Sequence, residues 1–80
     1  MEDKTSIYTL EDIEEQEVLL ILRDVKNALK EKGYNPINQI VGYLMSGDPG
    51  YISSYKGARS KMTNLNREKI LEVLLKKEFE

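Results

Sequence analysis

Residues 14–33 read EEQEVLLILRDVKNALKEKG, and this stretch decides the fold. Its apolar side chains recur every three or four residues, which is the period of an amphipathic α-helix. The stripe comprises Val18, Ile21, Leu22, Val25, Ala28 and Leu29. Glutamates precede the stripe, lysines end it and Gly33 follows, an order that suits the helix dipole and a glycine stop. We therefore predict a helix from about Glu14 to Lys32.

Two leucines in this helix do not fit the stripe. At 100° per residue, Leu19 and Leu20 point roughly 100° and 200° away from Val18. They indicate either a second contact surface, such as a dimer interface, or a core that wraps around the helix. We expect a mixture of both.

Cap residues and prolines divide the remaining chain into short helices. Asn35-Pro36 opens a second helix that Ser46-Gly47 closes, and Asp48-Pro49 starts a short helical turn. A third helix is predicted from about Tyr55 to Asn64, and Asn66 can cap a last one. The residues expected to face inward are Ile37, Ile40, Val41 and Leu44, then Ala58, Met62 and Leu65, and finally Ile70, Leu71, Leu74 and Leu75.

The predicted fold class is all-α, a compact bundle of about four to five short helices, because no segment alternates with a period of two. Eighty residues make one domain, and so short a chain buries only about 60% of its unfolded surface. Cysteine and histidine are absent, which excludes disulfides, thiolate zinc sites and imidazole chemistry. Self-association is the remaining source of stability, so we predict a homodimer without cofactor or metal.

Charge is distributed unevenly along the chain. Residues 1–17 hold seven acids against one lysine, a balance of −6, and the rest hold eleven bases against seven acids, a balance of +4. Residues 1–13 have no sustained period, so we predict a flexible acidic N-terminal tail before a helical domain of residues 14–80. No apolar run approaches the roughly 18 residues that span a bilayer, and no secretory signal is recognised. We expect a cytoplasmic protein without membrane insertion.

The sequence lacks the patterns of known catalytic sites. It has no nucleophile–base pairing, no glycine-rich phosphate loop and no HExxH spacing. Asp48 before Pro49 is typical of a helix cap rather than of a catalytic acid. We therefore expect no enzymatic activity.

A basic stretch with aromatic neighbours is the main candidate for binding. Five bases and one acid, Glu68, lie within residues 56–69. The candidate partner-binding residues are Lys56, Arg59 and Arg67, with Tyr51 and Tyr55 just before them. A small helix-turn-helix-like DNA-binding regulator is the alternative interpretation, but the sequence pI of 5.2 argues against nucleic acid. A protein-binding or phosphate-binding patch is favoured over a solvated helix face.

The N-terminal segment contains hydroxyl side chains that a kinase could phosphorylate. Thr5, Ser6, Tyr8 and Thr9 lie in a segment that can enter a kinase cleft without local unfolding. The apolar residues between them, Ile7 and Leu10, are typical of docking segments rather than of solubility tails.

The central run EKGYNPINQIVGYL, residues 31–44, continues as MSGDPGYI, residues 45–52. With Ala58-Arg59 and the stretch REKILE at residues 67–72, it closely resembles the IreB/ReoM family of regulatory phosphoproteins from Gram-positive bacteria. The resemblance covers nearly the whole chain beyond the tail.

This resemblance implies a small helical homodimer without enzymatic activity, phosphorylated on an N-terminal threonine by a membrane-spanning PASTA-type Ser/Thr kinase and dephosphorylated by a cognate phosphatase. It further implies a link to cell-wall synthesis. Unphosphorylated members promote Clp-protease degradation of the enzyme that commits UDP-N-acetylglucosamine to peptidoglycan, and phosphorylation relieves this. β-Lactam tolerance changes as a consequence.

Residue by residue, Thr5-Ser6-Ile7-Tyr8 matches the family phosphoacceptor pattern, so Thr5 inherits that role and Thr9 is the second candidate. Arg59 and Arg67 match family arginines, whereas Ser54 and Thr63 stand where basic residues are typical. A phosphate adds about −1.5 to −2 charge. We expect it either to fold the tail onto Arg59 and nearby lysines, on its own subunit or the partner, or to repel an acidic partner.

Overall fold

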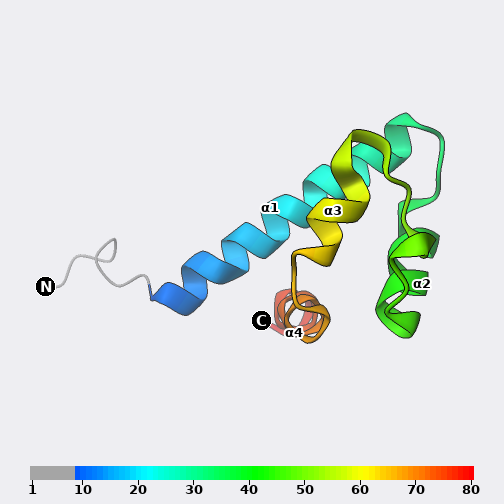
Figure 1. Ribbon diagram of the computed structural model, residues 1–80. Helices are drawn as coiled ribbons and strands as arrows, with labels where there is room; N and C mark the ends of the chain where they lie inside the picture. Colours follow the sequence, from blue (N-terminus) through cyan, green and yellow to red (C-terminus); the bar gives the residue numbers. More distant parts are fainter. Residues whose placement is uncertain (1–8) are drawn as a thin grey trace, which may run out of the picture.

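The computed structural model describes residues 9–80, and all regular structure in this range is helical (Figure 1). The α-helices are α1 (Leu10–Glu31), α2 (Pro36–Ser46), α3 (Ala58–Thr63) and α4 (Arg67–Phe79). Two short 3₁₀ helices, η2 (Pro49–Tyr51) and η3 (Tyr55–Gly57), lie between α2 and α3. The prediction of an all-α fold is confirmed.

The start of α1 differs from the prediction. The helix begins at Leu10, so residues 10–13 form its first turn and do not belong to a tail. Thr9 is its N-cap: the Thr9 hydroxyl accepts from the Asp12 backbone N–H at 3.0 Å, and the Asp12 carboxylate accepts from the Thr9 N–H at 3.1 Å. This reciprocal capping box satisfies two otherwise free donors. The acidic composition of the segment concealed this start signal.

The other helix ends follow the predicted caps. The side chain of Asn35 accepts from the Asn38 N–H, that of Asp48 from the Gly50 N–H, and that of Asn66 from the Lys69 N–H. Gly47 ends α2 with a φ of 77°, a conformation that glycine adopts without steric cost. The predicted boundaries of α2 and the start of α4 are therefore confirmed.

The predicted third helix is divided in two. Lys56 and Gly57 have φ values of 51° and 74°, which end η3 and redirect the chain into α3. Lys56 is the only non-glycine residue with a positive φ in residues 9–80. The continuous helix expected from Tyr55 to Asn64 is thus a 3₁₀ turn, a kink and a short α-helix.

The long helix α1 organises the molecule. Helix α3 packs along the C-terminal half of α1 and runs antiparallel to it, since Lys56 pairs with Glu31 and Lys61 with Asp24. In Figure 1, α2 lies below that end of α1, and α4 is viewed nearly along its own axis while α1 lies across the view. The result is an elongated body of 49 × 23 × 21 Å.

The core joins α1 to α3 and to the inner sides of the other helices. Its buried residues are Val18, Val25, Ala28, Leu29, Tyr43, Ile52, Ala58, Met62, Ile70 and Val73. The predicted α1 stripe is confirmed, with Ile21 and Leu22 half-buried against the core. Leu19 also packs against the core, which confirms a core that wraps around this side of α1, and Leu20 is exposed.

The inward faces predicted for α2 and α4 were partly wrong. Ile37 and Val41 are exposed on α2, where Tyr43 is buried and Ile40 and Leu44 are half-buried. Leu71, Leu74 and Leu75 are exposed on α4, where Ile70 and Val73 are buried. Both helices are apolar on more than one side, so periodicity alone does not select the side that the core uses.

Candidate phosphoacceptor end and basic surface

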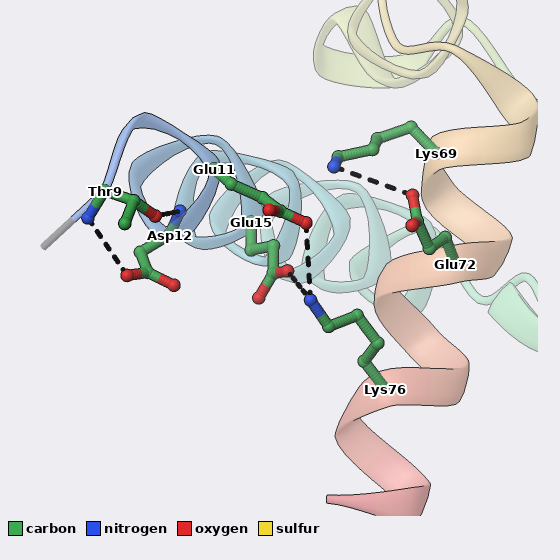
Figure 2. A network of polar contacts seen from close by, with 7 residues as sticks. All are labelled: Thr9, Glu11, Asp12, Glu15, Lys69, Glu72 and Lys76. Atoms are coloured by element: carbon green, nitrogen blue, oxygen red, sulfur yellow. Dashed lines mark hydrogen bonds and ion pairs between the residues drawn. The ribbon is translucent and has the colours of Figure 1, made fainter.

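The N-terminal end of α1 carries one of the two candidate phosphoacceptors. Thr9 is exposed, but its hydroxyl oxygen and its backbone N–H are both engaged by Asp12 (Figure 2). Thr5, the preferred candidate, lies outside the described residues, four positions before this cap. The two candidates therefore differ in that one is built into a helix end.

A lysine from α4 fixes the helix next to this cap. The Lys76 ammonium donates to the carboxylates of Glu15 and Glu11, which lie in the first turns of α1 (Figure 2). The hydrogen bond to Glu15 raises the pKa of Lys76. Sequence reasoning missed Lys76, although its contacts place the C-terminal part of α4 beside the start of α1.

The predicted basic and aromatic residues divide into two groups. Tyr55 and Lys56 lie at the C-terminal end of α1, where the Tyr55 hydroxyl donates to Glu31 and the Lys56 ammonium lies 2.8 Å from the same carboxylate. The ammonium of Lys32 lies 5.1 Å from the centre of the Tyr55 ring, within the range of a cation–π contact. This group presents two cations, Lys32 and Lys56, around one aromatic ring.

The second group lies around the end of α2. The Arg59 guanidinium donates to the Ile52 carbonyl at 2.8 Å, and the Arg67 guanidinium donates to the Leu44 carbonyl at 3.0 Å. Arg67 thereby satisfies one of the carbonyls left free at the C-terminus of α2. Arg59 thus contacts the residue that ends η2, and Arg67 contacts the end of α2. Both arginines remain exposed, so each retains donors for an external anion.

Tyr51 belongs to the second group through its ring. The ring is half exposed and lies against Gly42 of α2, where an added methyl group would stand 2.5 Å from the Tyr51 Cδ1 atom. Gly42 is therefore required by the ring and not by its backbone angles. This contact fixes η2 on α2.

Exchanging Gly42 for alanine tests that contact. In a helix interior, Gly→Ala is worth about 1 kcal/mol of stabilisation. In the wild-type background we expect no gain or a loss of up to about 1 kcal/mol, because the ring must move away. In a Tyr51→Ala background we expect the full gain. Urea unfolding of the four proteins measures the coupling, and equal effects of Gly42→Ala in both backgrounds would contradict it.

Salt bridges neutralise much of the basic surface. Lys56 pairs with Glu31, Lys61 with Asp24, and Lys69 with Glu72. A surface that reads DNA phosphates needs cations in excess. The first two pairs were invisible in the sequence because each joins α1 to a distant segment, whereas Lys69 and Glu72 lie three residues apart within α4. Together the three pairs weaken the DNA-binding alternative.

The carboxylates of Asp12 and Glu31 make the stability of the fold depend on pH in the acid range. Hydrogen bonding to the Thr9 backbone and hydroxyl lowers the pKa of Asp12, and the pairing with Lys56 lowers the pKa of Glu31. A carboxyl with a lowered folded-state pKa contributes stability above its unfolded pKa of about 4, and this stability is lost as pH falls through the folded value.

We therefore expect the melting temperature to fall below about pH 4, and Asp12→Asn to make this fall shallower. The amide keeps an acceptor for the Thr9 N–H but does not titrate. Melting curves followed by circular dichroism at several pH values provide the measurement. If the melting temperature falls equally below about pH 4 in both proteins, the Asp12 carboxylate does not contribute to the pH dependence of stability.

Comparison with known proteins decides which family this arrangement represents. The family model described as "IreB regulatory phosphoprotein" matches residues 3–80. The chain belongs to the IreB family. A relative named "UPF0297 protein" from Ruminiclostridium cellulolyticum is 51% identical over 74 residues, covering 92% of this chain and 84% of the relative. The resemblance seen in the central run is thus confirmed, and the family range includes Thr5.

Two further observations limit the chemistry of this IreB-family chain. Within residues 9–80, no group of three or more carboxylates is arranged to hold a metal ion. None of the described helices is long and apolar enough to cross a membrane. The candidate sites of this chain lie at the N-terminal end of α1 and at the basic residues of η3, α3 and the start of α4.

Proposed function

We propose that this chain is a non-enzymatic cytoplasmic regulator whose charge state at Thr5 is set by a PASTA-type Ser/Thr kinase and its cognate phosphatase. Membership of the IreB regulatory phosphoproteins across residues 3–80 carries the proposal. Unphosphorylated, the protein directs the first committed enzyme of peptidoglycan synthesis to Clp-dependent degradation. Phosphorylation relieves this and changes β-lactam tolerance.

The geometry favours Thr5 over Thr9 as the acceptor. A kinase binds its substrate as an extended segment, and Thr9 is followed directly by helix from Leu10. Phosphate transfer to Thr9 would require the first turn to unwind and the hydroxyl to leave the Asp12 N–H. A phosphate on Thr9 would gain from the helix dipole but would stand beside the carboxylate of Asp12.

Phosphorylation by the organism's own PASTA kinase, mapped by mass spectrometry, tests this preference. We expect Thr5→Ala to remove nearly all incorporation and Thr9→Ala to leave it almost unchanged. Adding Asp12→Ala to Thr5→Ala should increase phosphate on Thr9 severalfold, because losing half of the capping box favours fraying of the first turn. Equal incorporation at Thr5 and Thr9 in the wild-type protein would refute the assignment.

The α3 part of the basic surface, which holds Arg59 and Lys61, lies far along α1 from the cap that follows Thr5. Asp24, which marks the position of Lys61, lies fifteen residues beyond Thr9, or about 22 Å along the helix axis. Arg59 lies further still, towards the Lys56–Glu31 pair. Four residues of fully extended chain reach only about 14 Å. Of the two expected routes, we propose that any pairing of phosphate with Arg59 occurs between subunits.

The homodimer proposed here uses the exposed apolar side of α4. Leu71, Leu74, Leu75 and Phe79, called the α4 face below, are between 40% and 77% exposed. Their spacing of three and four residues places them along one side of the helix. Leu10, Ile13 and Leu20 are exposed on α1, and Lys76 brings the first turns of α1 beside α4. Burial of these residues against a second copy would supply the stability that so small a core lacks.

The partner-binding surface comprises the exposed cations of Lys56, Arg59 and Arg67 together with Tyr51 and Tyr55. A pull-down tests this role. The phosphorylated and the unphosphorylated protein are each used to capture the peptidoglycan enzyme and Clp components. We expect Arg59→Ala to weaken capture by the unphosphorylated form. Identical capture by the phosphorylated and unphosphorylated forms would end the proposed switch.

A further inference from the structure

Helix α2 has an exposed apolar side that the core does not use. Ile37, Val41 and Met45, called the α2 stripe, are 71%, 50% and 81% exposed. Their spacing of four residues aligns them on one side of the helix, away from the buried Tyr43. Exposing three large apolar side chains in a row is costly unless a partner covers them.

The charges around the α2 stripe have one sign at its N-terminal end. Helix α2 contains no charged residue. Lys26 and Lys30 of α1 line a groove of about 520 Å³ whose other walls include Tyr34 and Ile37. Among the ion pairs of residues 9–80, neither lysine takes part. The N-terminal end of the α2 stripe therefore lies beside this groove and beside two lysines that form no ion pair within the described part of the chain.

The opposite end of the stripe is balanced in charge. Arg67 lies against Gly47, and the carboxylate of Asp48 accepts from the Gly50 N–H. The electrostatic preference of this surface is therefore set by Lys26 and Lys30.

We propose that the α2 stripe, with Lys26 and Lys30, docks an acidic amphipathic helix of another protein. The stripe runs from Ile37 to Met45, eight residue-to-residue steps or about 12 Å, which matches two turns of a docked helix. Apolar residues spaced by three and four on that helix would cover the stripe, and its carboxylates would pair with the two lysines. The proposal concerns a surface separate from Thr5 and stands whether or not Thr5 is phosphorylated.

Two other occupants fit less well. A membrane-binding helix carries a lysine-rich polar face and bulky aromatic or leucine side chains, and α2 has neither on its own surface. A second copy of the chain has a larger apolar surface available on the α4 face. Both occupants are distinguished by the experiment below.

The test uses the full chain with labelled methyl groups and a synthetic helix of about four turns carrying leucines every four residues and glutamates beside them. Two matched probes serve as controls. One is the same peptide with lysine in place of each glutamate, and the other has the same composition in scrambled order. We expect the acidic helix to shift the methyl resonances of Ile37, Val41 and Met45 and to bind at least about tenfold more tightly than either matched probe. Lys26→Glu with Lys30→Glu should reverse the preference towards the basic counterpart.

Substitutions then locate the site. Ile37→Gln with Met45→Gln should reduce binding of the acidic helix by about tenfold or more, while Leu74→Gln on α4 should leave it unchanged. Equal binding of the acidic and basic helices, or shifts confined to α4, would overturn the proposal. So would anionic phosphatidylserine vesicles that bind through the same residues, or conversion of the dimer to monomers by Ile37→Gln with Met45→Gln.

Discussion

Replacing Leu75 and Phe79 together by glutamine is expected to separate the proposed dimer into monomers. In the single chain these side chains are 53% and 77% exposed, so the substitution removes little from the internal core. In a symmetric dimer each change acts twice. Burial of four such side chains is worth on the order of 5 kcal/mol, which corresponds to a loss of about 10³–10⁴ in affinity.

Sedimentation velocity and light scattering at micromolar concentration measure this effect. Ile37→Gln with Met45→Gln is the matched control, since it changes two apolar residues on α2 that are even more exposed, and it is expected to leave the dimer intact. A dimer that survives the α4 substitutions would place the interface elsewhere. The helical content, followed by circular dichroism, shows whether α4 itself still folds.

Met62→Ala is expected to destabilise the fold strongly. Met62 is fully buried in α3, at the contact with α1 on which the core is built. Truncation of a buried methionine costs about 2–5 kcal/mol. The total stability of an 80-residue chain is on the order of 4–12 kcal/mol, so this single cavity removes much of it.

Met45→Ala is the matched control because it removes the same atoms at a position that is 81% exposed. We expect its free energy of unfolding to stay within about 0.5 kcal/mol of the wild type. Urea unfolding at fixed protein concentration gives both values. Similar losses for the two variants would mean that α2 is covered in solution or that α3 is loosely packed.

Helix ends were the most predictable part of this fold. Asn35, Asp48 and Asn66 cap the segments that they were expected to cap, because a cap needs only a side-chain acceptor and a local backbone N–H. The same signal was present at Thr9 and Asp12 but was masked by the surrounding acids. At this end of α1 the capping box, and not the local charge density, sets where the helix begins.

Burial on short helices was less predictable because it depends on tertiary contacts. On α4, the three leucines at 71, 74 and 75 outnumber Ile70 and Val73, yet the core buries the latter pair. The angle at which α4 meets α1 decides this choice, and that angle follows from contacts such as the pair between Lys76 and Glu15. Residues sixty positions apart leave no local pattern.

The candidate site was predictable in its residue types but not in their partners. Family resemblance pointed to Thr5, Arg59 and Arg67, and the family match covers all three. The sequence did not reveal that each arginine donates to a backbone carbonyl. Removal of either arginine therefore affects local structure as well as any partner, and a charge-preserving lysine substitution separates the two effects.

The length of α1 has a consequence for how such a regulator would respond to kinase activity. The helix separates its cap from the Lys56–Glu31 pair by about 33 Å. A phosphate that binds across the dimer would therefore occupy the basic surface of the other chain and not that of the chain that carries it. A pair phosphorylated on one copy would then have one occupied surface and one open surface. The number of occupied surfaces per dimer would rise in two steps with the fraction of phosphorylated chains. Dilution that separates the chains would abolish this response.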